Sequence, residues 1–120
     1  MRLGVVAALL GALAVAAGAF GAHALRDRME PAAINTFETA VRYQLVHTIA
    51  LIVAAQRKAQ HPSRAASFAG GLFLAGILLF SGSLYALAFG APRMVGAITP
   101  FGGLAFIAGW VALAVSFRAG

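Results

Sequence analysis

The chain contains no cysteine and very few charged residues. The absence of cysteine from its 120 positions excludes disulfides, thiolate metal sites, iron–sulfur clusters and a cysteine nucleophile. Charged residues make up 10% of the chain, whereas an ordinary soluble domain carries roughly 25%. Hydrophobic residues make up 62%, and a soluble domain of this size has too small an interior to hide so apolar a composition. These proportions exclude a soluble globular protein, a disordered chain and a coiled coil.

Acidic residues are the scarcest charged class, with three against nine lysines and arginines, and the net charge is +6. In a soluble protein this balance would indicate nucleic-acid binding. Here the basic residues stand singly or in small groups between apolar runs, as residues that flank membrane spans do. We therefore expect the lipid bilayer as the surrounding medium and no nucleic acid as a partner.

Three long runs lack any formally charged residue, at 3–25, 65–91 and 99–117, and they contain 23, 27 and 19 residues. A helix needs about 20 consecutive apolar residues to cross the hydrocarbon core of a bilayer. The three runs therefore predict three transmembrane helices. The first run ends in an A-x-A pattern at 22–24, but it is longer than the 7–15 apolar residues of a signal peptide. We expect this helix to be retained.

A fourth span is predicted with a weaker pattern. Residues 45–55 are apolar but too few to cross alone, and extension back through 36–47 brings charged and polar residues into the helix. Pro31 suits a first helical turn, and Asn35 with Glu38 resembles a capping box, so the helix begins near one of these two positions. We expect a helix at about 34–55. The alternative is an interfacial helix that never crosses, which would leave the termini on opposite sides.

Short connections between the predicted helices make sequential helices antiparallel neighbours. We expect one domain over 1–120, an all-α integral membrane protein with an up-and-down four-transmembrane-helix bundle and helices at about 3–25, 34–55, 65–91 and 100–117. The N-terminus, second connection and C-terminus carry five lysines and arginines, against three in the other two connections. This excess favours a multi-pass cell-membrane protein with both termini in the cytoplasm.

Small residues recur at helical spacing in the three apolar runs. Membrane helices associate through close van der Waals fit, which small residues permit. In the first run we expect Gly4, Gly11, Gly18 and Gly21 to pack against another helix. The third predicted helix offers Gly71 and Gly82 for the same purpose, and the last offers Gly102 and Gly109. These rows of small residues either hold the helices of the monomer together or form an interface with a partner.

Polar side chains gather on the weaker predicted helix. Ionisable residues inside a span are costly and are therefore functional candidates. At 100° per residue, Glu38, Arg42, Tyr43 and His47 cover one half of the helix, and His23 lies at a depth similar to that of Glu38. These five residues form the candidate polar cluster. It is either a mutually neutralised structural cluster or a pocket that binds a headgroup, quinone or ion, or that relays protons.

No catalytic, cofactor-binding or metal-binding constellation follows from the sequence. A haem with two axial histidines needs them at similar depths, but His23 lies about 3 Å inside its helix and His47 about 18 Å inside, at 1.5 Å per residue. Ser81 and Ser83 have no base and orienting acid nearby in sequence, and no phosphate loop or dinucleotide fingerprint occurs. We expect no cofactor, no metal and no enzymatic activity.

Four blocks in order carry a family resemblance: GAFGAHAL at 18–25, FETAVRYQLVH at 37–47, LFSGSLY at 79–85 and ITPFGGLAFIAGW at 98–110. The chain resembles the domain-of-unknown-function family numbered 423, small bacterial inner-membrane proteins with eukaryotic relatives that include transmembrane protein 256. The resemblance implies a four-helix protein of the inner membrane with a retained first helix, and it supplies no established activity, substrate or cofactor. The blocks contain His23, Glu38, Arg42, Tyr43, Gln44, His47, Ser81, Ser83 and Pro100.

Two functional hypotheses remain from the sequence. The first is a non-enzymatic scaffold or accessory subunit of a larger membrane complex, for example a respiratory one, or a homo-oligomer, with other membrane-protein subunits or itself as partner. The second is a small transporter or ligand-binding membrane protein that uses the polar cluster. Small multidrug transporters have a similar length but carry a working carboxylate in their first helix, and the first helix here has none.

Overall fold

The structure is a computed structural model that describes residues 2–118, and within these residues it contains helices and no strand. η1 and η2 are π-helical turns inside longer helices, and η3 is a 3-10 helix that leads into α6. The elements in chain order are α1 (Arg2–Ala16), η1 (Ala17–Gly21), α2 (Ala22–Leu25), α3 (Pro31–Gln60), α4 (Arg64–Gly76), η2 (Ile77–Ser81), α5 (Gly82–Ala88), η3 (Arg93–Ala97) and α6 (Thr99–Arg118). The all-helical prediction is confirmed.

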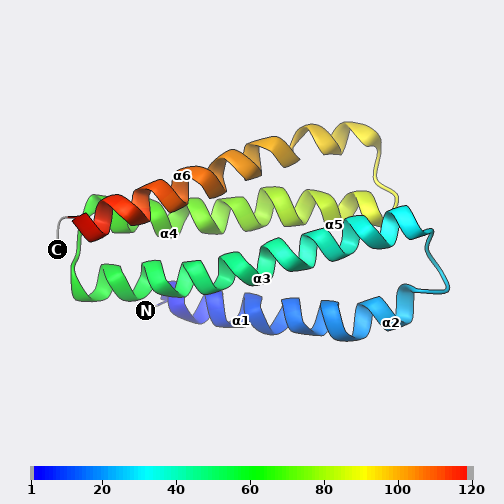
Figure 1. Cartoon of the computed structure of the whole chain (residues 1–120), viewed down its shortest axis with the longest axis horizontal. Helices are drawn as coiled ribbons and strands as arrows, with labels where there is room; N and C mark the ends of the chain where they lie inside the picture. The colour runs from blue at the N-terminus through cyan, green and yellow to red at the C-terminus, as the bar shows by residue number, and fades with distance from the viewer. Residues whose placement is uncertain (1, 119–120) are drawn as a thin grey trace.

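The elements run up and down as antiparallel rods: α1 with η1 and α2, then α3, then α4 with η2 and α5, then η3 with α6 (Figure 1). Both ends of the chain lie at one end of the molecule, here called the terminal end, together with the last turn of α3. The opposite end, the loop end, holds the 26–30 and 89–92 connections. There Gly90 takes a φ of 101°, which a residue with a side chain rarely adopts, directly after α5.

Three of these rods are long and apolar enough to cross a membrane, at Arg2–Leu25, Arg64–Ala88 and Arg93–Arg118. α3 is not among them, because polar and charged residues interrupt its apolar stretch. It is longer than the expected 34–55 at both ends, with Pro31 in the first turn and Gln60 as the last residue. Pro31 suits that turn because a first-turn residue needs no N–H for the helix.

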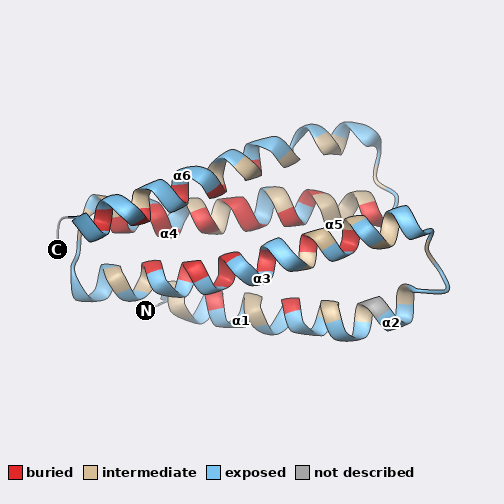
Figure 2. Ribbon diagram, viewed as in Figure 1, coloured by how far each residue is buried: buried red, intermediate tan, exposed pale blue. Residues whose placement is uncertain are grey.

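α3 lies at the centre of the packing. α1 packs against it, α4 and α5 pack against another part of its surface, and α6 packs on α4. Figure 2 shows buried residues concentrated on the facing sides of α3 and α4, whereas α1 buries only Ala7 and Ala14. The molecule measures 50 × 27 × 18 Å, so it is flat rather than square in cross-section. α1 is therefore a flanking helix with a large outer face.

The outer surface is apolar over much of its length. Large hydrophobic side chains are exposed on α1 and α6, and the Phe20 side chain is 75% exposed. A water-soluble monomer rarely presents a contiguous apolar surface this extensive. The exposed hydrophobic residues are therefore those expected to face lipid.

The α1–α3 interface uses three of the four predicted glycines. A Cβ added at Gly11 would lie 3.6 Å from Thr48 Oγ1, one at Gly18 would lie 3.1 Å from Val41, and one at Gly21 would lie 2.8 Å from the Phe37 ring. Nothing lies within 4 Å of a Cβ at Gly4, which corrects its expected packing role in this chain.

The α4–α6 interface is tighter and differs in part from the predicted rows of small residues. Gly102 lies against the Phe80 backbone, and a Cβ at Gly109 would meet the Phe73 ring at 2.8 Å. On α4, however, Gly76 receives the Phe106 ring, whereas Gly71 and Gly82 have nothing within 4 Å. The π-helical turn η2 changes the azimuth of residues after Ile77, so a regular helical count misplaces Gly82.

Candidate functional site

The middle of α3 buries polar side chains and exposes large apolar ones. Its buried side chains include the polar residues Gln44, His47 and Thr48. Between Arg42 and Gln56 its exposed residues are Leu45, Val46, Ile49, Ile52 and Val53, with Tyr43 at the start. A soluble helix turns its apolar stripe inward. Gln44 and His47 bond to neighbouring helices, Thr48 bonds to the Leu45 carbonyl of α3, and an apolar surface faces outward.

Gln44 bridges three helices. Its Nε2 donates to the backbone carbonyl of Leu10 in α1 at 2.7 Å, and its Oε1 accepts from the Tyr85 hydroxyl in α5 at 2.7 Å. The two bonds use both ends of the amide, so its orientation follows from its partners.

Serine hydroxyls make the next contacts toward the loop end. Ser81, the last residue of η2, is buried and donates to the Ala40 carbonyl of α3 at 2.8 Å. Ser83 lies 2.6 Å from the Thr99 hydroxyl at the start of α6, and it also donates to the Phe80 carbonyl at 3.0 Å. These bonds connect the α4–α5 rod to α3 on one side and to α6 on the other.

His47 lies inside a cluster of aromatic rings from α3, α4, η2 and α6. Its ring stacks on Phe106 with centroids 3.6 Å apart and an interplanar angle of 11°. Tyr43, one turn earlier on α3, has its ring centroid 6.0 Å from His47 and 4.5 Å from Phe80. Two further rings surround the imidazole, with centroids 5.9 and 5.8 Å away, and they belong to Phe73 and Trp110.

The hydrogen bonds of His47 define its tautomer. Trp110 Nε1 donates to His47 Nε2 at 3.1 Å, and an indole nitrogen is a donor only. Nε2 must therefore be the acceptor, so Nδ1 carries the proton and donates to the Tyr43 carbonyl at 2.7 Å. A proton added at Nε2 would face the indole N–H and break this bond. The imidazole is held in its neutral form with both nitrogens occupied.

The five residues of the predicted polar cluster fall into two groups. His47 is buried and Tyr43, which is 40% exposed, stacks on it. Glu38, Arg42 and His23 are exposed, and within residues 2–118 no hydrogen bond or ion pair joins them to one another or to the first group. Contacts of Gly18 with Val41 and of Gly21 with Phe37 place His23 level with about Thr36, near the level of Glu38.

The π-helical turn η1 changes the azimuth that the sequence predicts for His23. A π-helical turn contains one more residue than an α-helical turn. One additional residue rotates every later side chain by about 100° relative to a regular helix. Because Ala17–Gly21 precedes His23, an azimuth counted from the start of α1 does not apply to this residue.

Tyr85, Trp110, Phe73, Phe80 and Phe106 belong to this network but were not among the predicted site residues. Gln44 belongs to the second family block but not to the five residues of the candidate polar cluster. One signal in the sequence favours two of them: Trp110 is the single tryptophan, and Tyr85 is one of two tyrosines, both in otherwise apolar runs. A buried indole or phenol usually requires a hydrogen-bond partner.

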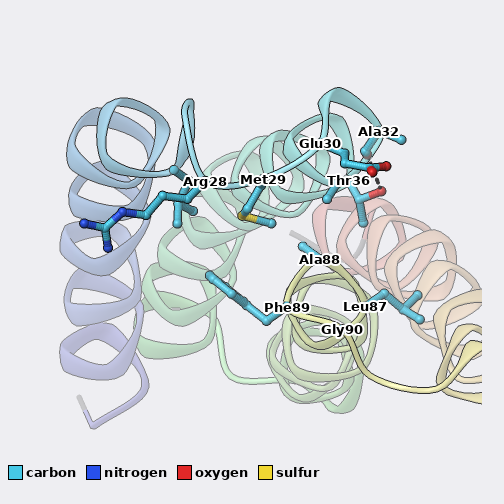
Figure 3. A pocket seen from close by; sticks show the side chains of 11 residues that line it. Arg28, Met29, Glu30, Ala32, Thr36, Leu87, Ala88, Phe89 and Gly90 are labelled. Atoms are coloured by element: carbon cyan, nitrogen blue, oxygen red, sulfur yellow. Dashed lines mark hydrogen bonds between the residues drawn. The ribbon is translucent and has the colours of Figure 1, made fainter.

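A separate open pocket of about 700 Å³ lies at the loop end (Figure 3). Met29 and Phe89 line its middle, and Glu30 and Thr36 lie on one side. Arg28 lies on the other side, and its guanidinium extends away from the remaining lining residues (Figure 3). The two charged residues are thus at opposite edges of an apolar pocket. No group of three His, Asp or Glu side chains capable of holding a metal occurs within the described part of the chain.

Most of the chain is similar to known proteins. The model of the family described as "Protein of unknown function (DUF423)" matches residues 17–103. A "UPF0382 membrane protein" of Haemophilus influenzae is 46% identical over 107 residues, which cover 89% of this chain and 86% of the relative. A "UPF0382 membrane protein" of Staphylococcus haemolyticus is 42% identical over 93% of this chain and 91% of the relative.

A third relative is the "UPF0382 inner membrane protein YgdD" of Escherichia coli, which is 40% identical over 115 residues, 92% of this chain and 85% of the relative. No solved structure matches the chain. The family matched is the one that the four sequence blocks resemble, so that prediction is confirmed. The chain is a small membrane protein and belongs to the DUF423 family.

Proposed function

We propose that this chain is a four-span protein of the inner membrane that acts without catalysis, as a scaffold or accessory subunit of a larger membrane complex or of a homo-oligomer. The proposal rests on one observation, that buried polar groups of α3 form hydrogen bonds to other helices. Gln44 and His47 bond to other helices, and Ser81 bonds back to α3. Polar groups bound to protein in this way connect helices and are not free to bind a transported substrate.

The fourth span is α3. It lies antiparallel beside α1 and beside the α4–α5 rod (Figure 1). Its 30 residues measure about 45 Å at 1.5 Å per residue, more than the roughly 30 Å of a hydrocarbon core. The outward apolar residues from Leu45 to Val53 supply its lipid-facing surface. An interfacial helix would instead lie across the ends of the other rods.

The terminal end faces the cytoplasm in this proposal. All three acidic residues lie in the 26–30 connection or in the half of α3 nearest to it, away from the terminal end. The terminal end carries Arg2, Arg57, Lys58, Arg64 and Arg118. A basic excess of this kind marks the cytoplasmic side of a multi-pass protein.

The outer face of α1 is the surface proposed to contact a partner. Ala8, Ala12 and Ala16 are exposed at intervals of four residues, and Gly4 precedes Ala8 by the same interval. Small residues at this spacing permit close approach of a second membrane helix. The partner is another membrane-protein subunit or a second copy of this chain, whose small residues would pack against α1 in the same way.

The experiment is purification of the tagged chain from its native membrane at native expression, in mild detergent, followed by mass and partner identification. Recovery with a larger complex at fixed stoichiometry, or as a homo-oligomer without a bound small molecule, supports the proposal. Recovery as an isolated oligomer with a bound small molecule contradicts it and favours the transporter. Reporter fusions test the spans separately: those after Gly120 and within 57–64 are expected to be cytoplasmic, and one within 26–30, on the other side of α3, is expected on the opposite side of the membrane.

A further inference from the structure

Arg57 lies where the last turns of α3 and α6 meet at the terminal end. Its Nη2 donates to the Ser116 carbonyl at 2.7 Å, and its guanidinium carbon lies 4.7 Å from the centroid of the Phe117 ring. The bond satisfies one of the carbonyls that the end of a helix leaves without a partner. The ring contact and the bond together hold the guanidinium plane in one place.

The charge of Arg57 has no carboxylate partner within residues 2–118. Among the described residues its buried Nε has no acceptor, and of its five N–H groups one is bonded, to Ser116. The acidic residues lie toward the other end of the molecule, so none can neutralise it. An arginine anchored at a helix end with donors remaining is a binding element for a planar or tetrahedral anion.

A pocket of about 280 Å³ adjoins this guanidinium, and its lining changes from apolar to polar along α3. Ile52 and Val53 line the part nearer the middle of the molecule. Gln56, Arg57 and Gln60 line the part nearer the terminal end, and Phe117 of α6 closes one side. The residues one turn inside Arg57 therefore offer a surface for hydrocarbon, and Arg57 with the two glutamines offers donors for a headgroup.

We propose that this pocket, here called the Arg57 pocket, binds an anionic phospholipid, with the phosphate on Arg57 and Gln60 and an acyl chain along Ile52 and Val53. Basic pockets between membrane helices on the cytoplasmic side bind anionic headgroups. The polar-to-apolar order of the lining distinguishes a lipid from a free phosphate, which would leave Ile52 and Val53 without a partner. The proposal rests on α3 as a span and is independent of the scaffold role.

Native mass spectrometry of the purified full chain tests the site. The chain in neutral detergent is supplied with equal amounts of phosphatidylglycerol and phosphatidylcholine that carry the same acyl chains. We expect a preference for phosphatidylglycerol of about fivefold, the factor that one basic residue supplies near an anionic surface. Arg57→Gln should abolish this preference. Lys58→Gln removes the same charge from the next residue, which does not line the pocket, and should keep the preference.

Two further measurements distinguish a bound lipid from a bound free phosphate and from a folding defect. Val53→Phe keeps all charges and fills the apolar part, so it should reduce retention of both lipids, even if Arg57→Gln does not fold. Inorganic phosphate should not displace the lipid, because it lacks an acyl chain. An equal preference in the parent, an equal loss in Lys58→Gln, or displacement by inorganic phosphate would each overturn the proposal. A failed topology test with an intact preference would instead contradict α3 as a span.

Discussion

The two helix pairs of the molecule hold together in different ways. In the α4–α6 pair, glycines face aromatic rings or backbone so closely that an added Cβ would collide, as at Gly76, Gly102 and Gly109. In the α1–α3 pair, Gly11 and Gly18 face side-chain atoms at 3.6 and 3.1 Å, only Gly21 faces a ring closely, and Gln44 adds a hydrogen bond to the Leu10 carbonyl. A side-chain tip can move, whereas a backbone cannot. The first pair should therefore be far less tolerant of substitution than the second.

The largest effect is expected for Gly102→Ala. The new Cβ would overlap the backbone nitrogen and Cα of Phe80, so α6 must move away from η2. Overpacking of this kind costs about 1–3 kcal/mol in soluble cores. Gly103→Ala is the matched control, because its Cβ would meet the Phe80 ring at an ordinary 3.9 Å. Unfolding in mixed micelles measures both, and equal stabilities would show that this contact is not close.

The next largest effect is expected for His47→Leu. His47 lies on α3 and contacts Phe106 and Trp110 of α6, so it connects the two helix pairs. The variant loses the Trp110 bond and part of the Phe106 stack, about 1–2 kcal/mol in total. Trp110 is the only tryptophan, so its fluorescence reports directly on the site. Emission should move to shorter wavelength when the indole N–H loses its acceptor. His61→Leu, at an exposed position, should leave the emission unchanged.

The sequence predicts the helices and depths well because both follow from local periodicity. Glu38, Tyr43 and His47 share α3 as expected, and the levels of His23 and Thr36 agree with a simple count of residues. The direction in which a side chain faces is harder to predict. The π-helical turns η1 and η2 each insert one residue, and nothing in the composition of these apolar runs indicates them. The partners of His47 also depend on how Phe106 and Trp110 of α6 approach, and that contact is tertiary.

A smaller effect is expected for Gln44→Leu, in the more tolerant pair. The variant loses the bonds to Leu10 and Tyr85, and hydrogen bonds between membrane helices average about 0.6 kcal/mol each. A double-mutant cycle with Tyr85→Phe isolates the bond between the two side chains. The coupling energy should be close to that average and should vanish if the Gln44 amide does not contact Tyr85.

A still smaller difference is expected between Gly18→Ala and Gly11→Ala. The Gly18 Cβ would lie 3.1 Å from Val41, so Val41 must shift slightly, whereas the Gly11 Cβ would meet Thr48 at an ordinary 3.6 Å. Alanine at Gly11 should be neutral or slightly stabilising, because glycine costs about 1 kcal/mol relative to alanine in a helix. Gly18→Ala should be the less stable of the two in the same unfolding assay. The reverse order would mean that α1 is rotated relative to this packing.

The smallest effect on the monomer is expected for Gly4→Leu. Nothing lies within 4 Å of this position, so a leucine fits without strain and replaces a poor helix former with a good one. The unfolding of the isolated chain should therefore stay within the error of the parent. Assembly is different, because Gly4 precedes the row of exposed alanines on α1 by one turn, and a leucine there would keep a second helix at a distance. Loss of co-purifying subunits or of the oligomer, with stability unchanged, would place the partner on this face. Unchanged stability with unchanged assembly would exclude this face as the interface and leave α1 in contact with lipid.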